Sequence, residues 1–252
     1  HQVVNFISNL FEVSRKKESY NLPNAKEACF SADVMVRQIF SRYNLLNKVS
    51  PFYNDLAEFL RDDFEPLLTP LVNITKKKYK YLNLNFNTEI PHEYKILSPS
   101  DFGFHNSIRN LNGELYFIDF EYFGWDDPAK LVGDFLLHPA IEDINFKLNE
   151  WKLFYKFIKK IFDFDNEFHS RLLLNLPLLS MRWSLILLNE FLPNNWERRV
   201  FSGEKKSRAT VLKNQLKKAR KYTRLVRWSI NSDEKNFLSE NYIDNFYLKS
   251  FN

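Results

Sequence analysis

The sequence predicts an α+β fold that is mainly helical, with one small β-hairpin in the middle of the chain. Apolar residues recur at helical spacing over most of the 252 residues. One Asn-Gly pair, Asn112-Gly113, precedes a short segment rich in aromatic and branched residues. With 44% hydrophobic residues, a chain of this length buries enough apolar surface for a single core, so we expect one domain over residues 1–252.

Helices are expected first. The N-terminus carries a helical face with spacings of 3, 1, 3 and 1, formed by Val3, Phe6, Ile7, Leu10 and Phe11. Apolar faces predict two further helices, at residues 26–47 and 54–69. Residues 76–81, which are rich in lysine, and the Asn-rich stretch up to Pro91 are expected to form an exposed connection.

The hairpin is expected next. Asn and Gly accept the positive φ of a tight turn, and residues 114–120 have the composition of the returning strand. Asp119 then lies at the end of the hairpin away from the turn, beside the segment that carries Asp101 and Asn106. We therefore expect these three side chains to come together.

Five helices are expected after the hairpin. Their predicted ranges are 128–138, 142–162, 166–191, 205–230 and 233–247, with a kink at Pro177. The most apolar stretch, 172–192, is interrupted by polar residues and is not expected to span a membrane. The single cysteine, Cys29, excludes an internal disulfide and fits a buried position in a cytoplasmic protein.

Asp101, Asn106 and Asp119 offer oxygen ligands of the kind that Mg²⁺ prefers. Such a site would suit phosphoryl transfer, in which a loop aspartate accepts the proton of an attacking hydroxyl. Taken by themselves, however, these residues favour turn-forming and capping side chains over a metal site. The histidines show no zinc-ligand spacing, so no zinc site is predicted.

Three motifs within residues 98–134 resemble a known family. Asp101 and Asn106 match an Asp-x4-Asn catalytic loop, residues 118–122 read IDFEY, and Asp127-Pro128 is followed by Asp134. This combination is similar to the aminoglycoside phosphotransferase and choline/ethanolamine kinase superfamily, which has a protein-kinase-like fold. The resemblance implies an ATP-dependent phosphotransferase that acts on a hydroxyl of an amino-alcohol, sugar or aminoglycoside-like acceptor.

The resemblance also implies residue roles. Asp101 becomes the catalytic base, Asn106 and Asp119 become the Mg²⁺ ligands, and Glu121 becomes a candidate second-metal or substrate contact. Asp127 and Asp134 are expected to support the structure. The candidate substrate-pocket residues are Trp125, Asp126, Trp183 and Glu190. Trp183 and Glu190 together are of the kind that encloses an ammonium group.

The chain departs from the family in two places. Pro99 stands where the family usually has histidine, two residues before the aspartate. None of the 5 glycines lies in the first hundred residues, so no glycine-rich phosphate loop is predicted. We therefore expect the large C-terminal lobe alone, without the nucleotide-binding lobe, with its catalytic and metal segment at 98–134 and its acceptor region at 135–252.

Two alternatives remain open from the sequence. The chain is also consistent with a non-catalytic, kinase-like interaction module. The segment from Lys205 to Arg227 is strongly basic and has no acidic residue, which is typical either of a solvated helix face or of a nucleic-acid or membrane surface. We expect the solvated face and no nucleic acid partner. The acceptor and the oligomeric state are not predicted.

Overall fold

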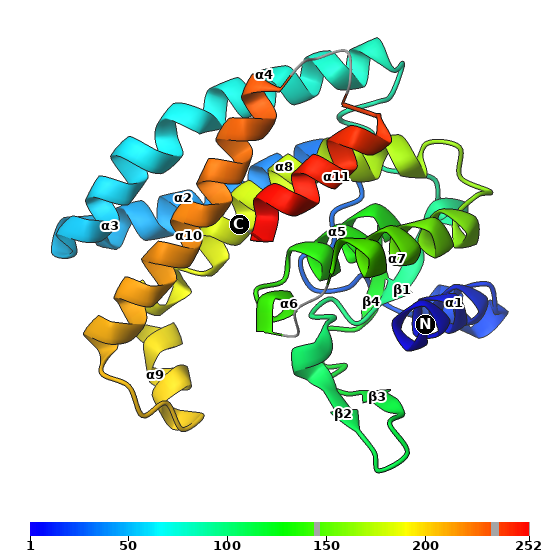
Figure 1. Cartoon of the computed structure of the whole chain (residues 1–252), viewed down its shortest axis with the longest axis horizontal. Coiled ribbons are helices and arrows are strands. Elements are labelled where there is room, and N and C mark those ends of the chain that lie inside the picture. Colours follow the sequence, from blue (N-terminus) through cyan, green and yellow to red (C-terminus); the bar gives the residue numbers. More distant parts are fainter. Residues whose placement is uncertain (144–146, 233–236, 252) are drawn as a thin grey trace.

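The computed structural model describes residues 1–143, 147–232 and 237–251. The described chain is mainly helical with a few short strands, as predicted (Figure 1). The first helices are α1 (Gln2–Ser14), α2 (Ala32–Val49), α3 (Asn54–Glu58) and α4 (Glu65–Tyr81). After the strands come α5 (Pro128–Leu137), α6 (Ala140–Asp143), α7 (Leu148–Ile161), α8 (Phe168–Ile186), α9 (Pro193–Phe201), α10 (Arg208–Asn231) and α11 (Glu240–Phe251).

Helix α8 is the centre of the core and packs against α2, α4, α5 and α10. Its side chains are buried on almost every side, as expected for a helix enclosed by others. The segment Phe168–Phe191 is long and apolar enough to cross a membrane, but 89% of its 18-residue apolar stretch is buried inside the protein. These apolar side chains therefore already have protein neighbours. The helix continues through Pro177.

Two antiparallel strand pairs lie near the predicted catalytic loop. Strand β1 (Ile96–Ser98) pairs with β4 (Gly124–Asp126), and β2 (Ser107–Arg109) pairs with β3 (Leu115–Phe117). Gly124 allows the loop before α2 to approach, since a Cβ there would lie 2.4 Å from the carbonyl oxygen of Pro23. The β1–β4 pair was not predicted, because three-residue strands show no alternation along the sequence.

The β2–β3 pair is the predicted hairpin, with a shorter return strand than residues 114–120. Gly113 has a φ of 81°, whereas Asn112 is not among the residues with positive φ. The N–H of Gly113 donates to the carbonyl of Asn110 at 3.0 Å. The Asn110 side chain accepts from the N–H groups of Asn112 and Glu114 at 3.0 and 2.9 Å. Only the glycine therefore uses the left-handed conformation that was expected for both turn residues.

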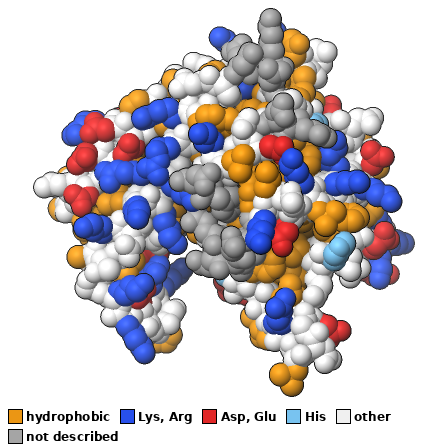
Figure 2. Space-filling model, in the orientation of Figure 1, with side chains coloured by type: hydrophobic (Ala, Val, Ile, Leu, Met, Phe, Trp, Pro, Cys, Tyr) orange, Lys and Arg blue, Asp and Glu red, His pale blue; other side chains and the backbone are white. Residues whose placement is uncertain are grey.

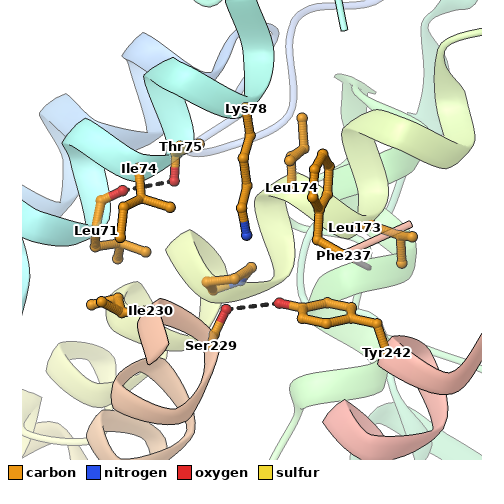
Figure 3. A pocket seen from close by; sticks show the side chains of 11 residues that line it. Leu71, Ile74, Thr75, Lys78, Leu173, Leu174, Ser229, Ile230, Phe237 and Tyr242 are labelled. Carbon is orange, nitrogen blue, oxygen red and sulfur yellow. Dashed lines mark hydrogen bonds between the residues drawn. The ribbon is translucent and has the colours of Figure 1, made fainter. Parts of the chain in front are cut away.

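The prediction that residues 76–81 form an exposed connection is wrong, because α4 continues to Tyr81. Lys78 points inward from α4, and its ammonium lies 4.6 Å from the ring centroid of Phe237 (Figure 3). The hydroxyls of Ser229 and Tyr242 are hydrogen bonded below it at 2.7 Å. The remaining cavity of about 10 Å³ is no larger than one water. The lysine-rich sequence predicts that Lys78 is exposed, but aromatic side chains around its ammonium group allow it to be buried.

Other boundaries also differ from the predictions. Residues 26–31 precede α2, which begins after Ser31, whose hydroxyl accepts from the N–H of Val34. Helix α9 was missed, since Pro193 opens a short and mostly polar segment. The predicted helix 142–162 is present as α7, with α6 before it. Residues 144–146 and 233–236, which were assigned to predicted helices, lie outside the described residues.

Candidate active site

The loop that carries Asp101 joins β1 to a short helical turn, Phe104–Asn106. Ser100 has a φ of 68°, in the left-handed region. Its hydroxyl donates to the carbonyl of Lys26 at 2.8 Å, and the N–H of Asp101 donates to the carbonyl of Pro99 at 2.9 Å. A serine in this conformation costs about 1–3 kcal/mol, which the surrounding contacts must offset. The loop is therefore fixed where it enters Asp101.

His105 folds back onto Asp101. Its Nε2 lies 3.1 Å from Oδ1 of Asp101. Gly103 makes room for the ring, since a Cβ there would lie 2.8 Å from Nδ1 of His105. The hydrogen bond from His105 lowers the pKa of the Asp101 carboxyl. The Asp101 side chain nevertheless remains 47% exposed, so it is both ionised and accessible.

His138, which follows α5, stacks on His105 with ring centroids 3.9 Å apart. Its Nδ1 accepts from the N–H of Ala140 at 3.1 Å, so the neutral ring carries its proton on Nε2. Burial, and then the nearby charge of His105, lower the pKa of His138 to about 4. Trp183 meets the His138 ring edge to face at 5.0 Å. His138 is therefore a neutral support between the Asp101 loop and α8.

A backbone hydrogen bond joins the segments that carry Asn106 and Asp119. The Nδ2 of Asn106 donates to the carbonyl of Asp101 at 2.9 Å, which leaves its Oδ1 as an acceptor. The N–H of Ile118 donates to the carbonyl of Asn106 at 2.9 Å, so Asp119 follows directly beside it. Asp119 has a φ of 65°, uncommon for a residue with a side chain.

The side chains of Asn106, Asp119 and Glu121 carry donor atoms of the kind that Mg²⁺ takes. Asp119 and Glu121 are exposed, and neither has an ion pair among the residues that the structure describes. Two carboxylates and an amide oxygen that is not otherwise engaged are hard oxygen ligands. The residues implied by the family resemblance therefore fit a magnesium ion.

A second donor group was not expected from the sequence. One ligand atom from each of Asp101, His105 and His138 lies within 4.8 Å of the others. The two imidazole rings are nearly parallel, with an interplanar angle of 6°. A metal ion binds in the plane of each imidazole, and one ion cannot lie in two separate parallel planes. This arrangement therefore supports the Asp101 side chain but does not form a metal site as it stands.

Asp126 is buried rather than part of a pocket. Its carboxylate is 0% exposed, faces Lys130 at 2.7 Å and accepts from the N–H of Cys29 at 2.9 Å. Burial alone lowers the pKa of Lys130, but the carboxylates of Asp126 and Asp134 outweigh it and raise that pKa. This ion pair therefore lies inside the fold, without access to a substrate.

Trp125 is also a core residue. It is 3% exposed, its indole N–H donates to the carbonyl of Ser19 at 3.1 Å, and its ring meets His92 at 4.5 Å. It points toward the N-terminal segments, and it does not line the cleft that Asp101 borders. The interpretation of Trp125 and Asp126 as substrate-pocket residues is thus corrected: although they follow the metal segment in sequence, both are buried inside the fold and neither lines the cleft beside Asp101.

Asp127 and Asp134 make structural contacts. Asp127 caps α5 by accepting from the N–H of Ala129 at 2.8 Å, and it faces Arg171 at 3.2 Å. Asp134 faces Lys130 at 3.1 Å and accepts from the indole N–H of Trp183 at 2.9 Å. These bonds tie α5 to α8, which lies behind the Asp101 loop.

A cleft of about 560 Å³ adjoins Asp101. Its wall includes two residues predicted as pocket residues, Trp183 and Glu190, together with Arg198 from α9 and Lys218 from α10. This volume suits a small-molecule ligand. Sequence reasoning missed the two basic residues. Pro193 could have indicated the start of a helix, and the pair Arg198-Arg199 within that helix could have indicated a basic surface.

The basic helix α10 packs through the predicted stripe. Leu212, Leu216 and Ala219 are buried, as are Thr223 and Val226. Arg220 pairs with Asp63 at 2.9 Å, so part of the positive face is matched within the protein.

Cys29 is buried, and burial raises the pKa of its thiol to about 12, which makes it a packing residue.

No protein-family model and no curated protein matches the chain. Among solved structures, it is similar to an ethanolamine kinase of Plasmodium vivax, with a TM-score of 0.49 and 15% sequence identity. The match covers 86% of this chain and 58% of that one, so this chain spans little more than half of that protein's length. Function is therefore inferred from the contacts of the site itself.

Proposed function

We propose that the protein is a phosphotransferase that moves the γ-phosphoryl group of ATP to a hydroxyl of a small molecule. The position of Asp101 carries this proposal, since it is an accessible carboxylate on the wall of a cleft of about 560 Å³. Asn106 donates to the carbonyl of Asp101, and the segment that leads into Asp119 is hydrogen bonded to Asn106, so two further residues with oxygen donors belong to adjoining segments. The observation that supports the proposal is thus an accessible acid on the wall of a cleft of ligand size.

Asp101 has the role of catalytic base. The acceptor oxygen forms a bond to the γ-phosphorus while the bond from that phosphorus to the β–γ bridging oxygen breaks, and ADP leaves. The hydroxyl proton passes to Asp101. His105 lowers the pKa of Asp101 and keeps it ionised near neutrality, as a proton acceptor must be. Phosphoryl transfer depends mainly on positioning and charge neutralisation, so a strongly basic group is not required.

Asn106 and Asp119 are the residues that would hold Mg²⁺, with Glu121 as a further ligand or a substrate contact. The bound ion would neutralise phosphate charge. His105 and His138 are positioning residues in this scheme.

The single, buried Cys29 fits a reducing compartment, and we extend the proposal to a cytoplasmic location.

The test is ADP formation by the full chain with ATP, Mg²⁺ and a panel of hydroxylated small molecules. Asp101→Asn should lower kcat about 10²- to 10⁴-fold, the usual contribution of a general base, and leave nucleotide binding largely intact. Asp119→Asn should lower kcat and weaken the Mg²⁺ dependence. Asp163→Asn alters an exposed aspartate that does not line the cleft, and should leave kcat unchanged.

Full activity in Asp101→Asn would remove the assignment of the base. A wild-type chain that forms no ADP, and that shows no Mg²⁺-dependent nucleotide binding by calorimetry, would instead support the non-catalytic alternative.

A further inference from the structure

The cleft beside Asp101 has a wall whose charges are mainly positive. Besides Asp101, its described charged residues are Glu190, Arg198, Arg199 and Lys218. Three of these four carry positive charge and one carries negative charge. The balance opposite the proposed base therefore favours an anion, provided that the one acidic group is neutralised within the protein.

Glu190 is already paired. Its Oε1 accepts from Arg199 and, at 3.3 Å, from Gln215. Its Oε2 is buried and has no hydrogen-bond partner among the described residues. Arg199 also faces Glu204 at 2.9 Å, so both members of the pair are held by neighbouring groups. The charge of Glu190 is thus balanced by Arg199 within the protein.

Arg198 and Lys218 are in a different state. Both are exposed, and within the described part of the chain neither forms an ion pair. Lys218 is near enough to His138 for its charge to contribute to the lowered pKa of that histidine. One residue comes from α9 and the other from α10, so they approach the cleft from two separate elements.

The surroundings strengthen this charge. Figure 2 shows the molecule notched between α9 and the β2–β3 hairpin, with lysine and arginine side chains on the flank formed by α9 and α10. Clefts lined by one sign of charge concentrate ligands of the opposite sign.

An ammonium cage, expected from Trp183 and Glu190, is not formed. Trp183 is 9% exposed, its indole N–H donates to Asp134, and its ring meets His138. A cation is bound by an open ring face or by a carboxylate whose charge is available. Both residues line the cleft, as expected of pocket residues, but the Trp183 ring packs on His138 and the charge of Glu190 is balanced by Arg199, so these contacts do not favour an ammonium group between them.

We propose that the acceptor is a small hydroxylated anion, which Arg198 and Lys218 bind through its carboxylate or phosphate group while its hydroxyl faces Asp101. This inference rests on the proposed function for the role of Asp101, but the anion site itself can be tested without catalysis. Arginine and lysine are the usual partners of carboxylate and phosphate oxygens.

The experiment measures binding of matched probes to the full chain by calorimetry at low salt. Glycerate and glycerol 2-phosphate supply the two anionic groups, glycerol is the neutral probe, and ethanolamine is the cationic one. Both anions, or one of them, should bind at least about tenfold more tightly than glycerol and ethanolamine, and added salt should weaken this binding. The stronger of the two anions identifies the group that the site prefers.

Variants locate the site. Arg198→Gln and Lys218→Gln should each weaken anion binding about tenfold, the loss expected for one charge-assisted contact. Lys217→Gln is the matched control, since Lys217 is exposed on the same helix and does not line the cleft. Far-ultraviolet circular dichroism verifies that each variant keeps its helices.

Preferential binding of ethanolamine, absence of anion binding, or equal losses in Lys217→Gln and Lys218→Gln would each overturn the inference. Anion binding that depends on Arg198 and Lys218, without any phosphoryl transfer, would support the anion site and count against the proposed function. Phosphoryl transfer to ethanolamine that depends on Asp101 would support the proposed function and count against the anion site.

Discussion

Two neighbouring regions of this protein carry acidic residues in opposite environments. In residues 101–121 the acids relevant to the site are exposed or half-exposed, and they are Asp101, Asp119 and Glu121. In residues 126–134 they are buried against lysine or arginine, and they are Asp126, Asp127 and Asp134. All six residues carry a carboxylate side chain, so the chemistry of the side chain does not distinguish the two regions. Burial beside an opposite charge marks an acid as structural, while exposure beside a cleft leaves it available for chemistry.

The physical reason is the cost of burying charge. A carboxylate that leaves water loses several kcal/mol of solvation, which an ion pair and hydrogen bonds must replace. Asp126 has such replacements in Lys130 and the N–H groups of Cys29 and Asp127. Asp101 keeps solvent on one side and needs only His105. The two regions should therefore respond differently to substitution.

The largest effect is expected in the buried region. Lys130→Met should lower the free energy of unfolding by about 3–5 kcal/mol, because it leaves the buried charge of Asp126 uncompensated, while Asp134 keeps Arg182 at 3.3 Å. Urea denaturation measures this. Lys213→Met, at an exposed position of α10, should stay within about 0.5 kcal/mol of the wild type. A loss below about 1 kcal/mol in Lys130→Met would show that the buried pair does not hold the region together.

A smaller effect is expected where the two regions meet, at His138. Burial lowers its pKa from 6.5 to about 4, and the charge of His105 adds to this. Between these pH values the unfolded chain binds a proton that the folded protein excludes, so stability falls as the pH falls. The loss reaches at most about 3 kcal/mol. It is complete near pH 4.

Urea denaturation at pH 6.5 and 4.5 tests this for the wild type and His138→Gln. The variant should lose less stability over that interval, whatever its stability at pH 6.5. Equal losses in both proteins would mean that His138 is not the group that titrates there.

The smallest effect on stability is expected at Asp101. The hydrogen bond from His105 lowers its pKa, so its contribution is present above pH 3.8 and disappears as the pH falls through the folded-state value. Since the side chain is 47% exposed, solvent screens the interaction. Asp101→Asn should therefore change the free energy of unfolding at pH 7 by less than about 1 kcal/mol. A loss as large as that of Lys130→Met would mean that Asp101 is a structural acid, like those of the second region.

Local patterns predicted the helical character and the hairpin. The periodicity of α1 and the basic stripe of α10 appear in the structure as predicted. Gly113 forms the turn, because its φ is a property that the residue itself allows. The lysine-rich end of α4 was misread, since composition indicates exposure and does not reveal aromatic rings around Lys78. Strands β1 and β4 were too short to leave a pattern.

The part of the candidate site that depends on local geometry was also predictable from the sequence. The sequence places Asp101, Asn106 and Asp119 around a hairpin, and the backbone bonds between their segments follow from that short-range geometry. Neither the folding back of His105 nor the stacking of His138 upon it could be predicted. The second contact joins residues on different elements.

The sequence alone predicted most of the helices, the hairpin, and which acids, by their spacing, flank that hairpin. These are local properties of backbone preference and apolar periodicity. Only the tertiary structure decided which charges are neutralised. Arg171 reaches Asp127 across 44 positions, and Trp183 reaches Asp134 across 49. Whether a carboxylate or a lysine is matched or available depends on partners that folding brings near it, and local sequence carries no record of them.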